Sequence, residues 1–313
     1  RSALTFGFDY FKKTTTGMLM DQPIPRYGGK EAPIANAGDM ENSGLEFELG
    51  YRGRAGEFTY FINGNASYLT NKLIKLGNES GEAIYENAGA TGLGPYVKGK
   101  NGEVFPFFYG FKTDGILQNQ AEADAYNAAY SKNARPGDVR FVDYNNDGKI
   151  DDDDRTKIGK GMPDWTYGIN LGAEWKNFDL SMFFQGTIGN DIFDYSMRGD
   201  IPAMNRPAWI LDRWTGEGTS NRLPRMTNAN PNGNWASSDL YIKDGSYLRL
   251  KNIQLGYTLP NAISRSVSIQ KFRVYVAAEN LLTFTSYDGF DPEIASGGYT
   301  TIGIDRGIYP QAR

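Results

Sequence analysis

The chain has 313 residues and a net charge of −4 at neutral pH, and it contains no Cys and no His. The acidic balance argues against nucleic acid as a partner. The missing Cys and His exclude disulfides, Ser-His and Cys-His catalysis and zinc sites of the usual kind, so we do not expect an enzyme. No apolar run reaches the length of about 18 residues that a membrane helix needs, but the alternating strands of a membrane β-barrel would show no such run either.

Alternation of apolar and polar residues predicts three strands in the N-terminal part of the chain. They are expected at residues 4–10, 45–51 and 58–68. A loop rich in Pro and Gly, from residue 21 to about 33, separates the first two, and a short turn at 52–57 separates the second from the third.

One helix is predicted inside residues 76–163, where regular alternation otherwise fails. Asn119 is expected to cap this helix, and Glu122 completes a capping box with it. The residues that share one face of the helix are Ala125, Tyr126, Ala129 and Tyr130. A loop as long as 76–163 is normally functional or disordered.

An acidic stretch in the same region has the spacing of an EF-hand calcium loop. Its twelve positions run from Asp143 to Asp154, with Gly148 at the sharp turn. Oxygen ligands are expected at alternate positions from the start of the loop and at its end, one of them a main-chain carbonyl. The predicted ligand residues are Asp143, Asn145, Asp147, Lys149, Asp151 and Asp154.

The ion predicted in this loop is structural, and it is Ca²⁺ or Mg²⁺, of which ligand number and flexibility favour Ca²⁺. No helix pair flanks the loop, which argues against a calcium-sensor switch. Asp154 reaches less far than the Glu usual at the last position, so bidentate closure is less secure. The alternative is a solvated acidic turn.

Alternation resumes in the C-terminal half and predicts four strands, at residues 165–175, 178–184, 247–257 and 272–279. The apolar positions change parity between Leu250 and Ile253, which predicts a β-bulge. Short turns are expected at 176–178 and 260–270, whereas residues 196–240 form a second long loop.

About seven long strands, joined alternately by short turns and long loops, are typical of an outer-membrane barrel rather than of a soluble sheet. Apolar side chains would face outer-membrane lipid. The polar side chains expected to face the lumen are Glu46, Glu48, Asn63, Asn65, Glu174, Asp179, Arg273 and Glu279. Lipid does not tolerate the open edges that an odd strand number leaves, so we expect a fragment or a chain that pairs with another.

Several of these segments together resemble the C-terminal barrel of SusC/RagA-type TonB-dependent transporters. The resemblance is strongest at Gly137-Asp138-Val139-Arg140-Phe141 and the acidic loop that follows. It extends over residues 42–46, 158–159, 163, 167–168, 176–180, 247–253, 255–257 and 279–281. The match covers nearly the whole chain.

The resemblance implies an all-β fold, an antiparallel transmembrane barrel of about 22 strands of which this chain would supply the last third, without the plug, the TonB box and the closing strand. It implies a TonB-dependent importer of glycans or peptides in the outer membrane of a Gram-negative cell. A SusD-like surface lipoprotein would form its lid, and TonB would act through the missing N-terminal part.

On this hypothesis residues 76–163 and 196–240 are extracellular loops and the short turns are periplasmic. Trp209, Trp214 and Trp235 are candidates for stacking on a ligand, although a loop Trp more often holds its own loop together. Glu46 and Glu48 share a face two residues apart, so like-charge repulsion in a wet lumen is favoured over a catalytic acid pair. The rival hypothesis is a secreted, calcium-stabilised, β-rich carbohydrate-binding module, which would need a two-sheet sandwich.

Overall fold

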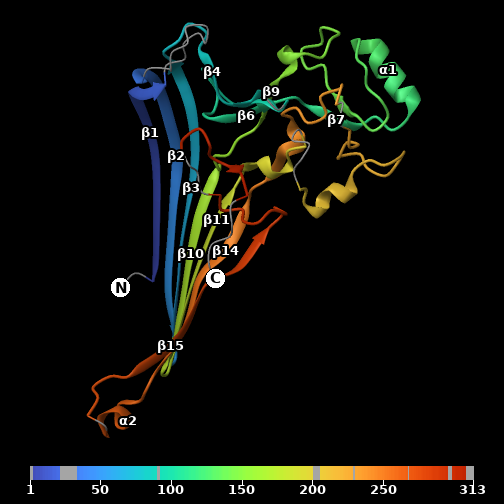
Figure 1. Ribbon diagram of the computed structural model, residues 1–313. Coiled ribbons are helices and arrows are strands. Elements are labelled where there is room, and N and C mark those ends of the chain that lie inside the picture. Colours follow the sequence, from blue (N-terminus) through green and yellow to red (C-terminus); the bar gives the residue numbers. More distant parts are fainter. Residues whose placement is uncertain are drawn as a thin grey trace.

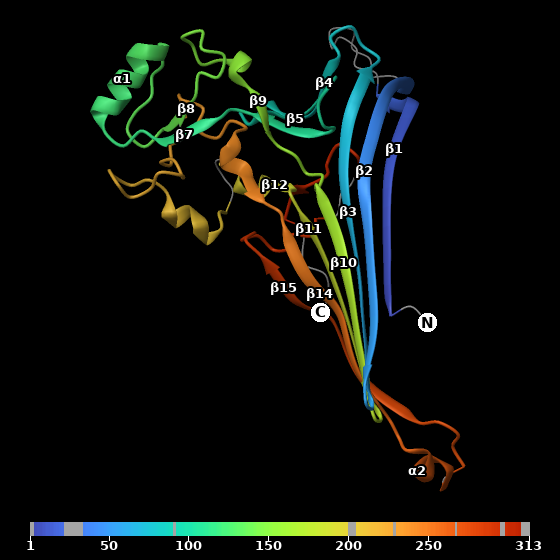
Figure 2. The same cartoon turned by 180° about the vertical axis from the view of Figure 1, so that it is seen from behind.

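A computed structural model of the chain describes residues 3–21, 34–89, 92–199, 205–227, 230–266, 268–294 and 298–307. One tall sheet of seven strands forms the body, and a cap of smaller sheets and short helices lies at one end of it (Figures 1 and 2). The predicted loop from residue 21 to 33 lies outside the described residues from position 22 onward.

The seven-stranded sheet is antiparallel throughout, and its order is β1–β2–β3–β10–β11–β14–β15. Its strands are β1 (Leu4–Asp21), β2 (Ile34–Ala55), β3 (Phe58–Leu76), β10 (Trp165–Trp175), β11 (Phe178–Ile188), β14 (Tyr247–Thr258) and β15 (Arg273–Thr285). The prediction of about seven long strands is confirmed. Since all seven lie in one sheet, the described residues do not form the sandwich that the rival hypothesis required.

The three N-terminal strands are longer than their alternation predicted. β1, predicted at 4–10, continues to Asp21, and β2 and β3 also extend beyond the predicted 45–51 and 58–68. Beyond Tyr10 most residues of β1 are polar or small, so the period of two is invisible in the sequence while the hydrogen-bonded register with β2 continues. A register shift between Thr15 and Met18, where Gly17 has a φ of 65°, hides the pattern further.

Strict register sorts the side chains of the sheet onto two faces. All eight residues predicted to face the lumen lie on one face, which we call the inner face. For example, Glu48 is opposite Asn65, and Arg273 donates to Asp179. The other face, the outer face, carries exposed apolar side chains such as Phe6.

The outer face is an apolar band with a sharp upper boundary. Its upper boundary row is Tyr10, Leu45, Tyr68 and Trp165, which are paired in register across β1, β2, β3 and β10. Trp175, at the other end of β10, pairs with Phe178 near the lower edge of the band. The 11 residues of β10 span the band. At a rise of about 3.3 Å per residue and a tilt of about 40° they cover a height of about 25 Å, which is the height of the apolar band of membrane barrels.

The β-bulge predicted in the strand of residues 247–257 is confirmed. The register of β11 with β14 shifts so that Phe183 and Phe184 face Asn252 and Leu250, which leaves Lys251 extra. A second shift lies beside it in the pairing of β14 with β15, where Asn280 has a φ of 50°. The outer face therefore stays apolar on both sides of the bulge.

The cap consists of the described residues in 77–164, 189–246 and 286–307. Its strands are β4 (Glu82–Ala88), β5 (Gly94–Lys100), β6 (Phe107–Gly110), β7 (Thr113–Ile116), β8 (Val139–Phe141), β9 (Thr156–Gly159), β12 (Asp191–Asp194), β13 (Ile242–Asp244) and β16 (Ile304–Asp305). Its helices are α1 (Gln120–Tyr130) and the 3₁₀ turns η3 (Asp152–Asp154), η4 (Tyr195–Met197), η5 (Ala208–Asp212) and η6 (Asp239–Tyr241). The prediction of a single helix and no strands for 76–163 was therefore incomplete.

The capping of α1 agrees with prediction at its first bond and differs at the second. The Oδ1 atom of Asn119 accepts from the main-chain N–H of Glu122 at 3.0 Å. The Glu122 carboxylate instead accepts from Gln118, one residue before the cap, at 2.9 Å. The helix ends at Tyr130, where Ser131 has a left-handed φ of 52°.

The inward face of α1 differs from the predicted one. Ala123 and Tyr126 are buried, whereas Ala125 and Ala129 are exposed and Tyr130 is partly buried. Positions 123, 125 and 129 all carry Ala, so the residue type does not distinguish the buried face of the helix from the exposed one.

Two hydrophobic clusters hold the cap together. The first cluster joins both long insertions and the C-terminal segment through residues such as Phe108, Phe193, Trp235 and Ile304. The second cluster packs α1, β7, β8 and the acidic loop together, with Tyr126, Phe141 and Ile150 among its members. A third, smaller cluster around Leu73 and Phe105 joins the cap to β3.

Connections alternate between the two ends of the sheet, as predicted. The turns after β2 and β10 and the helix α2 (Asn261–Ser266) lie at the end opposite the cap (Figure 1). Within the described residues, no helix is both long enough and apolar enough to cross a membrane.

Candidate functional site

The acidic loop between β8 and β9 is folded by its own side chains. Both carboxylate oxygens of Asp143 accept main-chain N–H groups, from Asp147 at 3.2 Å and from Gly148 at 2.9 Å. The Oδ1 atom of Asn145 also accepts from Asp147, at 3.0 Å. Gly148 has a φ of 83°, the left-handed conformation for which the EF-hand pattern places a glycine there.

Asp154 closes the loop from within. Its side chain is fully buried, and its Oδ1 atom accepts from the main chain of Tyr144 at 2.8 Å. Its Oδ2 atom accepts from Asp151 at 2.9 Å, and Asp151 in turn caps the 3₁₀ turn η3. The Asn145 N–H also donates to Asp154 Oδ1, at 3.3 Å, and the Asp147 N–H donates to both Asn145 and Asp143. The first and last predicted ligands are therefore linked through Asn145 and Asp147.

The six predicted metal ligands fit a hard cation by their chemistry, because all of them offer oxygen. Asp154 is buried, Asp143 is partly buried, and the other four are exposed. Within the described part of the chain, no three acidic side chains converge closely enough to hold an ion as they stand. Binding would therefore have to draw carboxylates inward, so the metal site stays a prediction.

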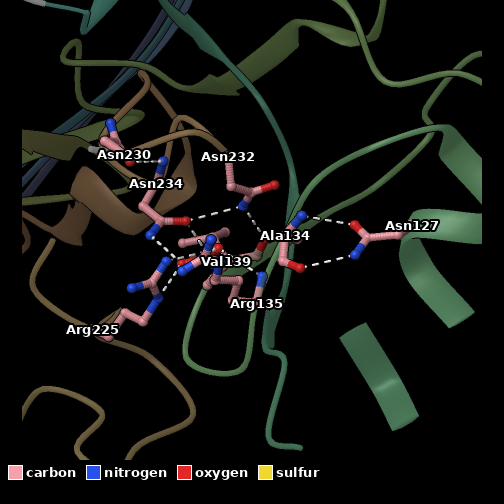
Figure 3. A network of polar contacts seen from close by, with 9 residues as sticks. Asn127, Ala134, Arg135, Val139, Arg225, Asn230, Asn232 and Asn234 are labelled. Carbon is pink, nitrogen blue, oxygen red and sulfur yellow. Dashed lines mark hydrogen bonds and ion pairs between the residues drawn. The ribbon is translucent and has the colours of Figure 1, made fainter. Parts of the chain in front are cut away.

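A buried network around Asp138 ties the two long insertions together. Figure 3 labels its partners Arg135, Arg225 and Asn234. The Asp138 carboxylate is fully buried and accepts from the Arg225 Nε atom at 2.7 Å and from the Asn234 side chain at 2.9 Å. It also accepts from the main chain of Arg135 at 2.8 Å. Four donors on a buried carboxylate, two of them from Arg225, satisfy a charge that would otherwise be costly.

Neighbouring amides extend this network to both sides. Asn232 donates to the Val139 carbonyl at 2.8 Å, and the Val139 N–H donates to Asn234 at 3.0 Å. On the other side, Asn127 of α1 donates to and accepts from the main chain of Ala134, at 2.8 and 2.7 Å (Figure 3). The side chains of Asn232 and Asn234 thus bond the main chain of β8, whose strand partner is β7.

The three Trp residues named as candidates for ligand stacking all pack against protein, which the sequence favoured for a loop Trp. Trp235 is 1% exposed and lies within the first cluster, so the prediction that it stacks on a ligand is wrong for this structure. Trp209 packs against the same cluster. Trp214 packs against the second cluster and donates to Gln118 at 3.2 Å. Trp209 and Trp214 are only partly buried, so their ligand role remains a prediction.

The inner face carries a shallow polar groove of about 710 Å³. Its lining includes side chains from β2, β3, β10 and β11, among them Glu48, Asn63, Asn65, Asn170 and Gln185. Amides both donate and accept, so the Asn and Gln side chains of this wall can exchange hydrogen bonds with water or with a polar ligand, and Glu48 adds one carboxylate.

A buried ion pair fixes the segment after β15 to the inner face. Arg249 of β14 lies 2.5 Å from the Asp291 carboxylate and 2.7 Å from that of Glu293, and Arg249 and Asp291 are almost fully buried. Lys251, the bulged residue, donates to Glu293 as well, at 2.6 Å. The cap is therefore tied to β14 by charge.

Two carboxylates of the cap have shifted pKa values with structural causes. Burial raises the pKa of Asp191 above its ordinary range, against the opposing effect of a main-chain N–H from Lys160. Hydrogen bonds from Ser246 lower the pKa of Asp244, so this carboxylate remains charged well into the acidic range. Both residues border β12 and β13, where the cap meets the sheet.

Sequence reasoning missed Asp138, Arg225 and Asn234. Asp138 lies in the segment 137–141 that carries the family resemblance, but the arginines near it in sequence do not reveal its side-chain partners. Arg140 pairs with Asp114 and Arg135 contributes its main-chain N–H, whereas Arg225 and Asn234 lie 87 and 96 residues away. The Asn-rich composition of residues 228–234 was the only available signal.

Comparison with known proteins bears on this fold. The profile of the family described as "TonB dependent receptor-like, beta-barrel" matches residues 1–281. The chain is similar to TonB-dependent receptor P3 of Formosa agariphila, with 33% identity over 99% of this chain and 31% of that receptor. It is also similar to TonB-dependent receptor SusC of Bacteroides thetaiotaomicron, with 26% identity over 99% of this chain and 29% of that receptor.

Among solved structures, the fold is similar to that of a chain in the RagAB peptide transporter. The TM-score is 0.76 at 24% identity, over 98% of this chain and 32% of that one. At this identity the likeness concerns the fold alone. The chain spans about a third of the length of the curated relatives that it matches.

The network around Asp138 generates a testable prediction. Asp138→Ala leaves the Arg225 guanidinium without its buried partner, and breaking a buried pair in this way costs about 3–5 kcal/mol. We expect faster proteolysis within residues 205–240, measured by limited digestion and mass spectrometry. Asp152→Ala, which removes a carboxylate whose side chain is 87% exposed, is the control and should leave the digestion unchanged. Equal digestion of both variants would contradict the role of Asp138.

Proposed function

The chain belongs to the family of TonB-dependent receptor-like β-barrels, and from this membership we propose that it is the C-terminal part of the barrel of an outer-membrane importer in a Gram-negative cell. The cargo is a glycan or an oligopeptide, and a SusD-like surface lipoprotein forms a lid over the cap. The N-terminal remainder of the receptor supplies the plug and earlier strands, and TonB acts through it.

The observation that carries this proposal is the division of the seven-stranded sheet into an apolar outer face and a polar inner face. Leu4, Phe6, Phe8 and Tyr10 are each more than half exposed on the outer face of β1. A water-soluble sheet would bury such a face, whereas lipid covers it in a membrane barrel. The apolar band of about 25 Å supports the same conclusion.

The inner face supports a path for polar cargo. Asn63, Asn65 and Asn170 offer neutral donors and acceptors, so a glycan hydroxyl or a peptide amide can exchange one hydrogen bond for another along the wall. RagAB is described as a peptide transporter, which supports an oligopeptide as one of the two cargo classes.

The importer proposal predicts that a bulky side chain on this wall, which narrows the lumen, blocks uptake of the cargo. Asn170 points inward and Ile169, its neighbour on β10, points outward. In the full-length receptor, Asn170→Trp should reduce growth on a polymeric cargo to the level of a strain without the receptor. Ile169→Trp adds the same bulk on the lipid side and should leave growth unchanged.

Growth on the monomer of the same cargo serves as the control, because small molecules do not need an active importer. Uptake of the polymer by the Asn170→Trp variant at the wild-type rate would contradict the proposed path. Uptake that persists after the proton-motive force is dissipated would contradict the whole function.

The proposed orientation can be tested by cysteine labelling, since this part of the receptor contains no Cys, and the receptor without an introduced Cys gives the background. Ala128→Cys places a thiol on the exposed side of α1 in the cap, and Glu57→Cys places one in the turn between β2 and β3. A membrane-impermeant maleimide on intact cells should label the cap variant. It should label the turn variant only after the outer membrane is permeabilised. The reverse pattern would invert the topology.

We also propose that the acidic loop binds a structural Ca²⁺, or Mg²⁺ in its place, through the six predicted ligands. The oxygen-only donor set and the hydrogen bonds that already fold Asp143 and Asp154 into one unit support this proposal. Bound metal would stabilise the cap against local opening, since it binds the ordered loop and not the open one.

The metal proposal predicts that chelator increases proteolysis at residues 143–154 in the wild-type receptor. Asp143→Ala and Asp147→Ala should be cleaved quickly with or without chelator, because the site is already lost. Asp152→Ala, in the same loop but outside the predicted ligand set, should keep its dependence on chelator. Wild-type cleavage that ignores both chelator and added Ca²⁺ would refute the site.

A further inference from the structure

Two rows of polar side chains lie on the outer face immediately above the upper boundary row. The first row is Lys12, Ser43 and Thr70, and the second is Thr14, Glu41 and Lys72. Both rows are paired in register across β1, β2 and β3. We call them the outer polar rows.

These rows belong to the part of β1–β3 that extends past the apolar band. β10 begins and β11 ends at the boundary row, at Trp165 and Ile188, so only the three N-terminal strands continue upward (Figure 2). The outer polar rows are therefore at the height of lipid headgroups whenever the apolar band is in lipid. Tyr and Trp in the boundary row are residues that prefer this level.

The chemistry of the outer polar rows favours an anion. Lys12 pairs with the Glu41 carboxylate at 3.0 Å, and its side chain remains 54% exposed. Lys72 is exposed and lies opposite Glu41 on the neighbouring strand. Two cations and one anion leave a positive balance. The hydroxyls of Ser43 and Thr70 bond each other at 2.9 Å, and Thr70 also donates to the Ser43 carbonyl at 3.2 Å, so they add no charge between the two lysines.

We propose that the outer polar rows bind the phosphate groups of a phosphorylated glycolipid in the outer leaflet, with Lys12 and Lys72 as the two cationic contacts. The proposal rests on the proposed function, because it requires that the cap end of the sheet faces the cell exterior. Lysines beside an anionic membrane surface each contribute attraction that corresponds to about a fivefold change in affinity.

Glu41 lies on the central strand of the outer polar rows, between Lys12 and Lys72. It holds Lys12 in place, and its own charge opposes a phosphate that approaches from directly above β2. The phosphates therefore bind at Lys12 on β1 and at Lys72 on β3, the strands on either side of β2. Thr70 lies in the same row as Lys12, and Thr14 lies in the same row as Lys72. Lys13, the next residue on β1, lies on the inner face opposite Asn42 and takes no part.

The test uses the full-length receptor in nanodiscs made of phosphatidylcholine with a small fraction of purified lipid A. Native mass spectrometry counts the lipid A molecules that the protein retains. Lys12→Gln with Lys72→Gln should reduce retention by about 25-fold, from about fivefold for each lysine. Lys13→Gln removes a charge one residue away on the inner face and should retain lipid A as the wild type does.

Glu41→Gln separates lipid binding from stability of the sheet. It removes the anion between the lysines, so retention should rise if phosphate is the ligand and should not rise if the rows only stabilise β2. Heat-dependent mobility on a denaturing gel confirms that each variant is assembled. Raised salt should weaken retention by the wild type, since exposed charges are screened.

Equal loss in the Lys13→Gln and the double variant would overturn the proposal, because net charge alone would then explain retention. Retention by the double variant at the wild-type level would overturn it as well. A receptor that fails to enter nanodiscs of either composition would instead refute the proposed membrane function, and this inference with it.

Discussion

In the apolar band of the seven-stranded sheet, each peptide group must find its hydrogen-bond partner in a neighbouring strand, because lipid supplies none. Six antiparallel pairings meet this demand between β1 and β15. The outer edges of β1 and β15 have no partner in the described chain, so further strands are required to complete the sheet in a membrane. Register, once set by pairing, also decides which side chains face lipid, since a slip by one residue would exchange the two faces. The two bulges at Lys251 and Asn280 preserve this assignment rather than break it.

The stability of the cap depends on a balance between conformational entropy and the burial of apolar side chains. Its insertions are long, and ordering them costs conformational entropy in proportion to their length. The first and second hydrophobic clusters offset that cost with buried side chains such as Phe193 and Tyr126. The Asp138 carboxylate then fixes how Arg225 and Asn234 lie against β8, because a buried charge tolerates few arrangements of its donors. A bound metal in the acidic loop would add to an already packed structure.

The sequence was informative where one physical period controls the structure. Alternation predicted the seven strands, their two faces and the bulge near Lys251, because burial in lipid or in water repeats every second residue. It failed in the upper part of β1, where a polar stretch covers both faces, and in residues 76–163. There β6, β7, β8 and β9 have only three or four residues each, and the seven-residue strands β4 and β5 show no regular period of two in their burial. The Asp138 network and the buried position of Trp235 depend on contacts across roughly ninety residues or more, for which local spacing carries no information.

The way the cap is joined to the sheet bears on how an importer of this kind could work. The buried Arg249 binds Asp291 and Glu293, and cluster packing continues from β12 into β16, so the cap and β14 form one body. At β3 the third cluster attaches the cap again. Opening this cap would break a buried ion pair and expose two apolar surfaces together, so the described cap is held closed by several contacts at once. On the proposed function, passage of cargo therefore depends on movement of the plug and the lid, and the inner wall and cap of this chain serve as the fixed surface against which they move.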